Sequence, residues 1–212
     1  MKLLTVLLRA GFHLLYNPLA WTYDLVSWLV SIGQWRHWQR SALPHLRGTH
    51  ILEIAHGTGH MLLEMAAGGM PPVGLDLSST MGRLARRRLR ASGRTALLVR
   101  GRAQALPFAD GAFSSLLSTF PAEFILETAT LRECCRVLQP GGRLVCVPLA
   151  RITGLALPDR VARLLFHYTG QSSDVFTAPL LKRCEAAGLT ARLEQVRLPR
   201  SVVVLLLAEK PL

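Results

Sequence analysis

Residues 51–60 read Ile-Leu-Glu-Ile-Ala-His-Gly-Thr-Gly-His, and Asp76 ends a second apolar stretch 17 positions after Gly59. An apolar run, a glycine turn, a helix and a second apolar run ending in an acid are typical of a β-α-β nucleotide-binding unit. The glycines allow the backbone to approach a ligand closely, and the acid can bind two ribose hydroxyls. Leu62 and Leu63 stand where a dinucleotide site has its third glycine. The pattern therefore favours a nucleoside without a pyrophosphate.

The rest of the chain continues this alternation from residue 49. Apolar runs predict strands near 50–55, 73–77, 95–100, 113–119, 143–149, 189–197 and 201–209, and helical spacing predicts helices near 60–68, 79–92, 125–138 and 176–187. The connection Leu198-Pro199-Arg200 is too short for a parallel crossover, so the last two strands must be antiparallel. We therefore expect an α/β fold with a Rossmann-like, doubly wound, seven-stranded sheet and an antiparallel last strand.

The first 48 residues form a separate helical region in this prediction. Between residues 2 and 15, polar residues recur every three or four positions, which predicts a helix with a wide apolar face. The segment is too short to cross a bilayer, which needs about 20 apolar residues. It can serve as a lid over the site, lie in a membrane interface, or do both. A second helix is expected from Leu25 to Leu43. Residues 49–212 form the main domain, with an insertion at about 150–175 over the substrate.

Composition and charge narrow the function without deciding it. Half of the 212 residues are hydrophobic, which predicts a packed core, and the four cysteines show no metal spacing, so we expect reduced thiols and a cytoplasmic location. The formal charge of +12 includes eight arginines and no acid between Asp76 and Asp110. That cluster can bind nucleic acid or anionic lipid. A solvated helix face is favoured, because Met81, Leu84, Ala85 and Leu89 fall at helical spacing and can face the sheet.

Several motifs resemble one enzyme family. Residues 51–60 and 74–78 look like the first two motifs of class I S-adenosylmethionine-dependent methyltransferases. Tyr23-Asp24, Ala105-Leu106-Pro107-Phe108 and residues 136–142 (Arg-Val-Leu-Gln-Pro-Gly-Gly) resemble the methyltransferase type 11 group, which includes the ubiquinone and menaquinone biosynthesis methyltransferases. The resemblance runs from about Tyr23 to Lys210 and implies S-adenosylmethionine as cofactor.

The resemblance also implies which residues contact that cofactor. Glu53 would meet the methionine ammonium, Asp76 would accept from both ribose hydroxyls, and the backbone N–H of Ala103 would reach the adenine ring. Met81 would pack on the adenine face, and Tyr23 would close over the methionine end. The complete set of implied cofactor contacts is Tyr23, Glu53, Ala55, Gly57, Gly59, Asp76, Leu77, Met81, Ala103 and Thr119.

Three positions depart from the family pattern. Ala55 replaces the usual first glycine, a mild change, and His56 stands where a cysteine or small residue is common. Arg102 replaces an aspartate that accepts from the adenine amino group. A guanidinium has five donors and no acceptor, so it cannot make this bond. Either another group such as Gln104 substitutes, or affinity for the cofactor is reduced.

Catalytic residues are less well defined than cofactor contacts. Glu123, His167 and Tyr168 fall on segments expected near the substrate, and each can take a proton, although the evidence for any one of them is weak. His56 and His60 bracket the glycine turn, but no third ligand lies at a plausible spacing, so no metal site is expected.

The sequence therefore favours an S-adenosylmethionine-dependent methyltransferase acting on a small hydrophobic or lipid-like acceptor, and contact to a membrane surface through the amino-terminal helix is an open alternative to a lid. An RNA methyltransferase, suggested by the arginines, is one alternative. A non-catalytic protein that keeps the fold, suggested by Arg102, is the other. An NAD-dependent oxidoreductase is disfavoured, because position 62 is not glycine.

Overall fold

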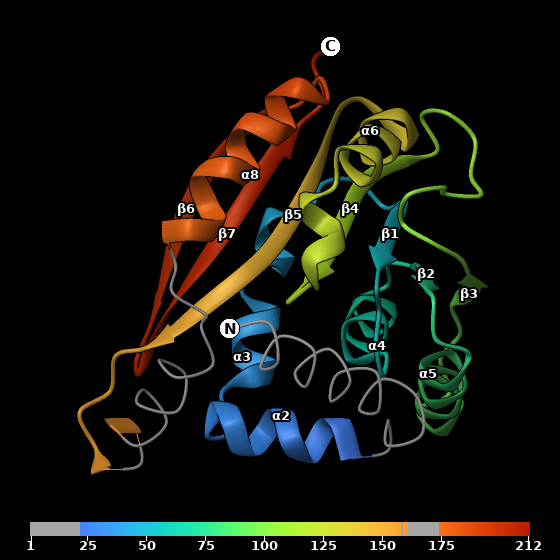
Figure 1. Ribbon diagram of the computed structural model, residues 1–212. Helices are drawn as coiled ribbons and strands as arrows, with labels where there is room; N and C mark the ends of the chain where they lie inside the picture. The colour runs from blue at the N-terminus through green and yellow to red at the C-terminus, as the bar shows by residue number, and fades with distance from the viewer. Residues whose placement is uncertain (1–21, 158, 161–173) are drawn as a thin grey trace, which may run out of the picture.

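The computed structural model contains one seven-stranded sheet with the strand order β3-β2-β1-β4-β5-β7-β6 (Figure 1). The structure describes residues 22–157, 159–160 and 174–212. The strands are β1 (Ile51–Ile54), β2 (Val73–Asp76), β3 (Leu97–Arg100), β4 (Phe113–Thr119), β5 (Leu138–Ile152), β6 (Thr190–Leu198) and β7 (Ser201–Glu209). β7 runs antiparallel to both β5 and β6, while the other pairs are parallel. The predicted sheet and its reversed strand are confirmed.

Helices cover both faces of this sheet. The α-helices are α2 (Tyr23–Ser31), α3 (Trp35–Arg40), α4 (His60–Ala67), α5 (Ser79–Ala91), α6 (Thr128–Val137) and α8 (Asp174–Ala186), with short 3-10 helices η2 (Leu43–His45) and η3 (Glu123–Leu126). Residues from α6, α8 and η3 share one core with one side of the sheet, and residues from α3, α4 and α5 share the other. Successive strand residues alternate between the two cores, as the period of two requires. The sheet is therefore buried on both faces, which explains its continuous apolar strands.

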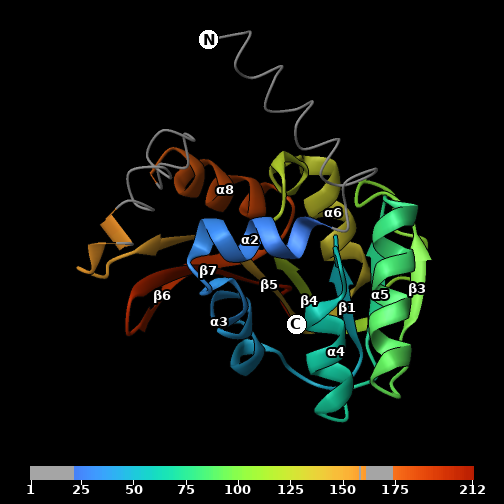
Figure 2. The ribbon, with the colours of Figure 1, turned by 90° about the horizontal axis from the view of Figure 1, so that it is seen from below.

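The predicted single helix from Leu25 to Leu43 is wrong. The chain forms α2, α3 and η2 there instead, because Ile32 and Gly33 both adopt left-handed backbone, at φ 51° and 75°. The Ser31 hydroxyl then accepts a hydrogen bond from the backbone N–H of Trp35 at 2.9 Å, which supports the start of α3. The break turns α2 so that it lies at the end of the sheet toward which the parallel strands run (Figures 1 and 2).

The arginine-rich helix has the predicted orientation. On α5, Met81, Ala85 and Leu89 are buried and Leu84 is half-buried, while the arginines at 83, 86, 87 and 90 are exposed. Arg88 is the exception, since it is half-buried and forms an ion pair with Asp24 of α2. Most of the positive charge in this part of the chain is therefore a solvated helix face.

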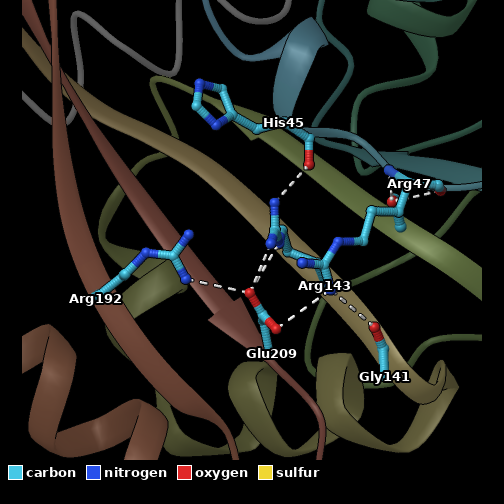
Figure 3. Close-up of polar contacts among 7 residues, drawn as sticks. His45, Arg47, Gly141, Arg143, Arg192 and Glu209 are labelled. Atoms are coloured by element: carbon cyan, nitrogen blue, oxygen red, sulfur yellow. Dashed lines mark hydrogen bonds and ion pairs between the residues drawn. The ribbon is translucent and has the colours of Figure 1, made fainter.

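A cluster of charges closes the opposite end of the sheet, where β7 ends beside the start of β5 (Figure 3). One carboxylate oxygen of Glu209 accepts from Arg143 at 2.6 and 3.2 Å and from Arg192 at 3.2 Å. The other oxygen faces Arg47 at 3.3 Å. The Arg143 side chain is only 9 % exposed and also donates to the carbonyl of His45 at 3.1 Å. Glu209 is therefore the counter-charge of a nearly buried guanidinium.

Substituting Glu209→Gln is expected to lower the free energy of unfolding by about 1 to 2 kcal/mol at pH 7, because it leaves the Arg143 charge without its carboxylate. Hydrogen bonds from Arg143 hold the pKa of Glu209 below its ordinary value of 4.5, although partial burial opposes this. A carboxyl with a lowered pKa stabilises the fold above the unfolded pKa and loses that contribution as pH falls through the folded pKa. Urea unfolding should therefore show a difference that is full at pH 7 and shrinks below pH 4.5.

The matched control is Glu194→Gln. Glu194 is 42 % exposed, and its Oε1 lies 3.9 Å from Nε2 of His45. Such an exposed pair contributes little, so this variant should unfold like the parent protein. An equal loss of stability in both variants would contradict the role given to Glu209.

Candidate active site

The segment that joins β1 to α4, residues 55–59, is called here the glycine loop. Ala55, Gly57 and Gly59 all have left-handed backbone, with φ values of 58°, 54° and 80°. A left-handed conformation costs a residue with a Cβ atom about 1 kcal/mol. Ala55 therefore carries a modest strain that the glycine usual at this position would not, which agrees with a mild change.

Asp76, the last residue of β2, holds the glycine loop in place. Its Oδ2 accepts from the backbone N–H of Gly57 at 2.9 Å, and its Oδ1 accepts from that of Ser78 at 2.8 Å. The two bonds join the turn after β1 to the turn after β2. A carboxylate offers about four acceptor positions, so two remain for a ligand.

A cavity of about 180 Å³ opens beside this junction. β1 has β2 on one side and β4 on the other, so the chain reverses its winding direction here, and ligands of doubly wound folds bind at such a switch point. Most of the lining is apolar. The cavity is lined by Ile54, Ala55, Leu75, Asp76, Leu77, Arg102, Ala103, Gln104 and Phe124.

Glu53 lies beneath the glycine loop on β1 and is only 2 % exposed. Burial raises the pKa of its carboxyl well above the ordinary value, and the nearby charge of Asp76 raises it further, while a backbone hydrogen bond at Leu62 opposes both. Among the described residues, Oε2 of Glu53 has no hydrogen-bond partner. A buried acceptor without a donor lowers the stability of the fold. The presence of such a group beside a candidate site therefore needs an explanation.

A group of aromatic side chains adjoins the end of β4. Trp35 stacks on Phe120 with ring centroids 4.1 Å apart, and Tyr23 meets Trp35 edge-on at 6.5 Å. Thr119, the last residue of β4, accepts from the side-chain amide of Gln39 at 2.9 Å. Helix α3 is thus joined to the carboxyl end of β4 by both apolar and polar contacts, and α2 adjoins α3 through Tyr23.

A second set of contacts links α2 to the glycine loop, and the sequence did not predict it. Oδ1 of Asp24 accepts from the Thr58 hydroxyl at 2.7 Å, and Oδ2 lies 2.5 Å from Arg88 and 3.1 Å from His60. Arg88 also donates to the Thr58 carbonyl. Burial would raise the pKa of Asp24, but hydrogen bonds from His60 and Thr58, with the charges of His60 and Arg88, hold it below its ordinary value. Only the Tyr23-Asp24 motif hinted at this role.

A larger hollow, of about 570 Å³, lies on the outer side of these contacts between α2, α4 and α5. Asp24, Arg87 and Arg88 line it. Apart from Thr58 of the glycine loop and Ser92, its lining comes from helices α2, α4 and α5, and the charges of Asp24 and Arg88 pair with one another. The smaller cavity at the switch point is therefore the better candidate for a nucleoside site.

The structure brings some of the sequence-predicted cofactor residues together and leaves others apart. Ala55, Asp76, Leu77 and Ala103 line the cavity at the switch point. Gly57 is not part of the wall, but its backbone N–H binds Asp76, which is. The remaining predicted residues lie outside the cavity wall: Tyr23, Glu53, Gly59, Met81 and Thr119. Met81 is completely buried in α5, and Gly59 packs against that helix at Ala85.

The residues predicted as candidate bases differ in where the structure places them. Glu123 is exposed at the start of η3, directly after the segment that follows β4. His167 and Tyr168 lie outside the described residues. The two loop histidines are engaged locally, because His60 pairs with Asp24 and Nδ1 of His56 lies 2.9 Å from the Gly57 carbonyl. Burial lowers the pKa of His56, against the opposing effect of Asp76.

The cavity, the loop bound to an acid at the end of β2 and the sheet with its reversed strand define the class I methyltransferase fold. An S-adenosylmethionine-dependent methyltransferase from Thermotoga maritima has the same fold, with a TM-score of 0.64 over 89 % of this chain and 95 % of that one, at 20 % identity.

Residues 6–168 match the ubiE/COQ5 methyltransferase family, and the chain belongs to this family. The demethylmenaquinone methyltransferase of Thermus thermophilus is 32 % identical over 205 residues, which cover 85 % of this chain and 93 % of that protein. The demethylmenaquinone methyltransferase of Symbiobacterium thermophilum is 36 % identical over 146 residues, which cover 65 % of this chain and 58 % of that protein's length. Family membership implies S-adenosylmethionine as the methyl donor.

Proposed function

We propose that the protein transfers a methyl group from S-adenosylmethionine to a small, hydrophobic, quinone-like acceptor. The observation that carries the proposal is the apolar cavity between the glycine loop and Asp76 at the switch point of the sheet. The relatives named demethylmenaquinone methyltransferase favour a quinone ring as the acceptor.

Asp76 fits the ribose of this donor. Its two bonds to the backbone at Gly57 and Ser78 fix the carboxylate and leave acceptor positions on both oxygens. Two hydroxyls on adjacent ribose carbons can each donate to one oxygen. The same two bonds hold the turn after β1 and the turn after β2 together. Asp76 therefore also helps to fix the shape of the cavity between these turns.

Glu53 fits the other end of the donor. Its Oε2 is buried and has no hydrogen-bond partner among the described residues, which is the environment a bound ammonium group would complete. A cation beside this carboxyl would offset the burial that raises its pKa. Binding of the ammonium group would explain why a glutamate stands in an otherwise apolar strand.

Methyl transfer requires mainly that the protein orients the donor and the acceptor and excludes water from the site. S-adenosylmethionine supplies a methyl group already activated by its sulfonium. The aromatic side chains of Tyr23, Trp35 and Phe120 would exclude water where β4 ends. Transfer to a ring carbon also releases a proton, and Glu123 is the described candidate to accept it.

We further propose that the protein works in the cytoplasm at a membrane surface, where a lipophilic acceptor resides. In the described parts of the chain, no helix is long and apolar enough to span a membrane. α2 nevertheless exposes Leu25, Trp28 and Leu29 at 57 to 58 % each. Exposed apolar side chains on one helix can be buried at the boundary between the headgroups and the acyl chains of a bilayer.

The membrane proposal predicts the effect of one charged substitution. Leu29→Glu should reduce the fraction of protein that floats with vesicles containing anionic lipid by several-fold, because burying a carboxylate near the acyl chains opposes binding. The control is Leu97→Glu on β3, where the leucine is 61 % exposed at the edge of the sheet. Equal flotation of both variants, together with no effect of deleting residues 1–16, would remove the membrane proposal.

The methyltransferase proposal is tested by calorimetry with S-adenosylhomocysteine and by transfer of labelled methyl groups to a demethylated naphthoquinol. Asp76→Asn should weaken S-adenosylhomocysteine binding by about 10- to 100-fold, since charged hydrogen bonds contribute about 1.5 to 3 kcal/mol. Asp110→Asn, at a side chain 80 % exposed and outside the cavity wall, should leave binding unchanged.

Two results would contradict this function. Absence of binding to either S-adenosylmethionine or S-adenosylhomocysteine at millimolar concentration would favour the non-catalytic alternative. Equal losses of affinity in the Asp76 and Asp110 variants would place the donor elsewhere in the molecule.

A further inference from the structure

The adenine end of the cavity contains an arginine where the family pattern has an aspartate. Arg102 is exposed and lines the cavity with Ala103 and Gln104. A guanidinium only donates hydrogen bonds, and the 6-amino group of adenine also donates. If the site binds an adenosyl donor, another side chain must accept the hydrogen bond from the 6-amino group, or this group makes no hydrogen bond with the protein.

The described cavity wall offers few acceptors. Of the nine described residues that line it, only Asp76 and Gln104 carry a side-chain oxygen. Asp76 is tied to the glycine loop by its bonds to Gly57 and Ser78, at the position suited to ribose. Gln104 follows β3, where the wall continues toward Phe124. It is therefore the side chain available to accept a hydrogen bond at the base.

Glu127 binds the nitrogen end of the Gln104 amide. Nε2 of Gln104 donates to Oε2 of Glu127 at 2.9 Å. A carboxylate accepts hydrogen bonds and does not donate them, so the amide nitrogen must face Glu127. The amide oxygen then points away from Glu127. Gln104 is half-buried, while Glu127 and the hydrogen bond between them are exposed to solvent.

We infer that Gln104, positioned by Glu127, reads the 6-amino group of adenine in this protein, in place of the carboxylate that the family pattern carries at position 102. The inference rests on the proposed function and adds the specificity of the site for its purine. It explains why an arginine can stand at position 102, since the side chain there no longer has to accept a hydrogen bond from the adenine amino group. It also gives Glu127, which lies outside the cavity, a positioning role.

The test compares two ligands that differ only at position 6 of the base. S-adenosylhomocysteine carries the 6-amino group, and its 6-deamino analogue carries a hydrogen there, so N1 is an acceptor in both ligands. Calorimetry on the full chain should show that the parent protein prefers the adenosyl ligand by about 10- to 100-fold, as expected for one polar contact that cannot be replaced.

Gln104→Leu should bring the ratio of the two affinities to within a few-fold, mainly by weakening the adenosyl ligand. Glu127→Gln should lower the same ratio by a smaller factor, because an amide at 127 can accept or donate and no longer holds Gln104 in one orientation. A purely structural role of Glu127 would weaken both ligands equally. The control is Gln195→Leu on β6, at the opposite edge of the sheet from β3, and its ratio should equal that of the parent.

The outcomes separate this inference from the proposed function. No binding of either ligand by the parent protein would remove the proposed function. Binding of both with equal affinity, or a ratio unchanged by Gln104→Leu, would overturn the role of Gln104 and leave the methyltransferase assignment standing.

Discussion

Replacing Glu53 by glutamine is expected to weaken S-adenosylmethionine binding by about 10- to 100-fold and, at pH 8, to raise the stability of the ligand-free protein by about 1 kcal/mol. The two effects have one cause. Glu53 is 2 % exposed, and burial, then the charge of Asp76, raise its pKa. A buried carboxylate without a cation is costly to the fold, while the same carboxylate is what a bound ammonium requires.

The sign of the pH dependence follows from that raised pKa. Between the unfolded value of about 4.5 and the folded value, the native protein binds more protons than the unfolded chain. The stability of the parent protein therefore falls as pH rises through this window. Glutamine does not titrate, so denaturant unfolding should show the gain from Glu53→Gln at pH 8 and little gain at pH 4.

Ligand choice separates this role from a general disturbance of the site. S-adenosylhomocysteine retains the ammonium group and should lose affinity for the Glu53→Gln variant, whereas 5′-methylthioadenosine lacks the amino acid and should bind both proteins equally. Binding of the first ligand should also release protons, since an ammonium favours the ionised carboxyl. Equal losses for the two ligands, or a less stable variant at pH 8, would show that Glu53 has another purpose.

The sheet was predictable because its elements are local patterns. Each strand is a short apolar run, and β4 and β7 have the bounds that the runs predicted, Phe113–Thr119 and Ser201–Glu209. The helix expected at 25–43 failed because one local choice, the left-handed pair Ile32-Gly33, overrides the helical spacing on either side. β5 begins earlier than predicted, since Leu138 already pairs with Phe113 before the glycine turn.

In the candidate site, only the residues at the ends of strands could be predicted from the sequence. Ala55 directly follows β1 and Asp76 ends the neighbouring strand β2, so the topology alone places them at one cavity. The pairing of Asp24 with Arg88 joins positions 64 residues apart, and no periodicity encodes it. The same holds for Gln104 and Glu127, which meet because η3 ends beside the segment after β3. Such contacts depend on packing between elements.

Gly59 allows α5 to pack closely against the glycine loop, and Gly59→Ala is expected to lower the free energy of unfolding by about 3 kcal/mol. A Cβ atom at position 59 would lie 2.6 Å from Cβ and 2.9 Å from Cα of Ala85, closer than packed atoms approach. Overpacking typically costs about 1 to 3 kcal/mol, and the left-handed backbone at φ 80° adds about 1 kcal/mol. Urea unfolding measures the sum.

Gly57→Ala provides the matched control, because it has the same backbone requirement without the collision. Its φ is 54°, and a Cβ atom there would meet nothing within 4 Å. This variant should lose only about 1 kcal/mol. Ala85→Gly, added to Gly59→Ala, removes the nearer of the two colliding atoms and should restore part of the loss despite the cost of glycine within a helix. Equal destabilisation by the two alanine substitutions would mean that backbone strain alone explains the glycines, and that the close contact with α5 contributes nothing.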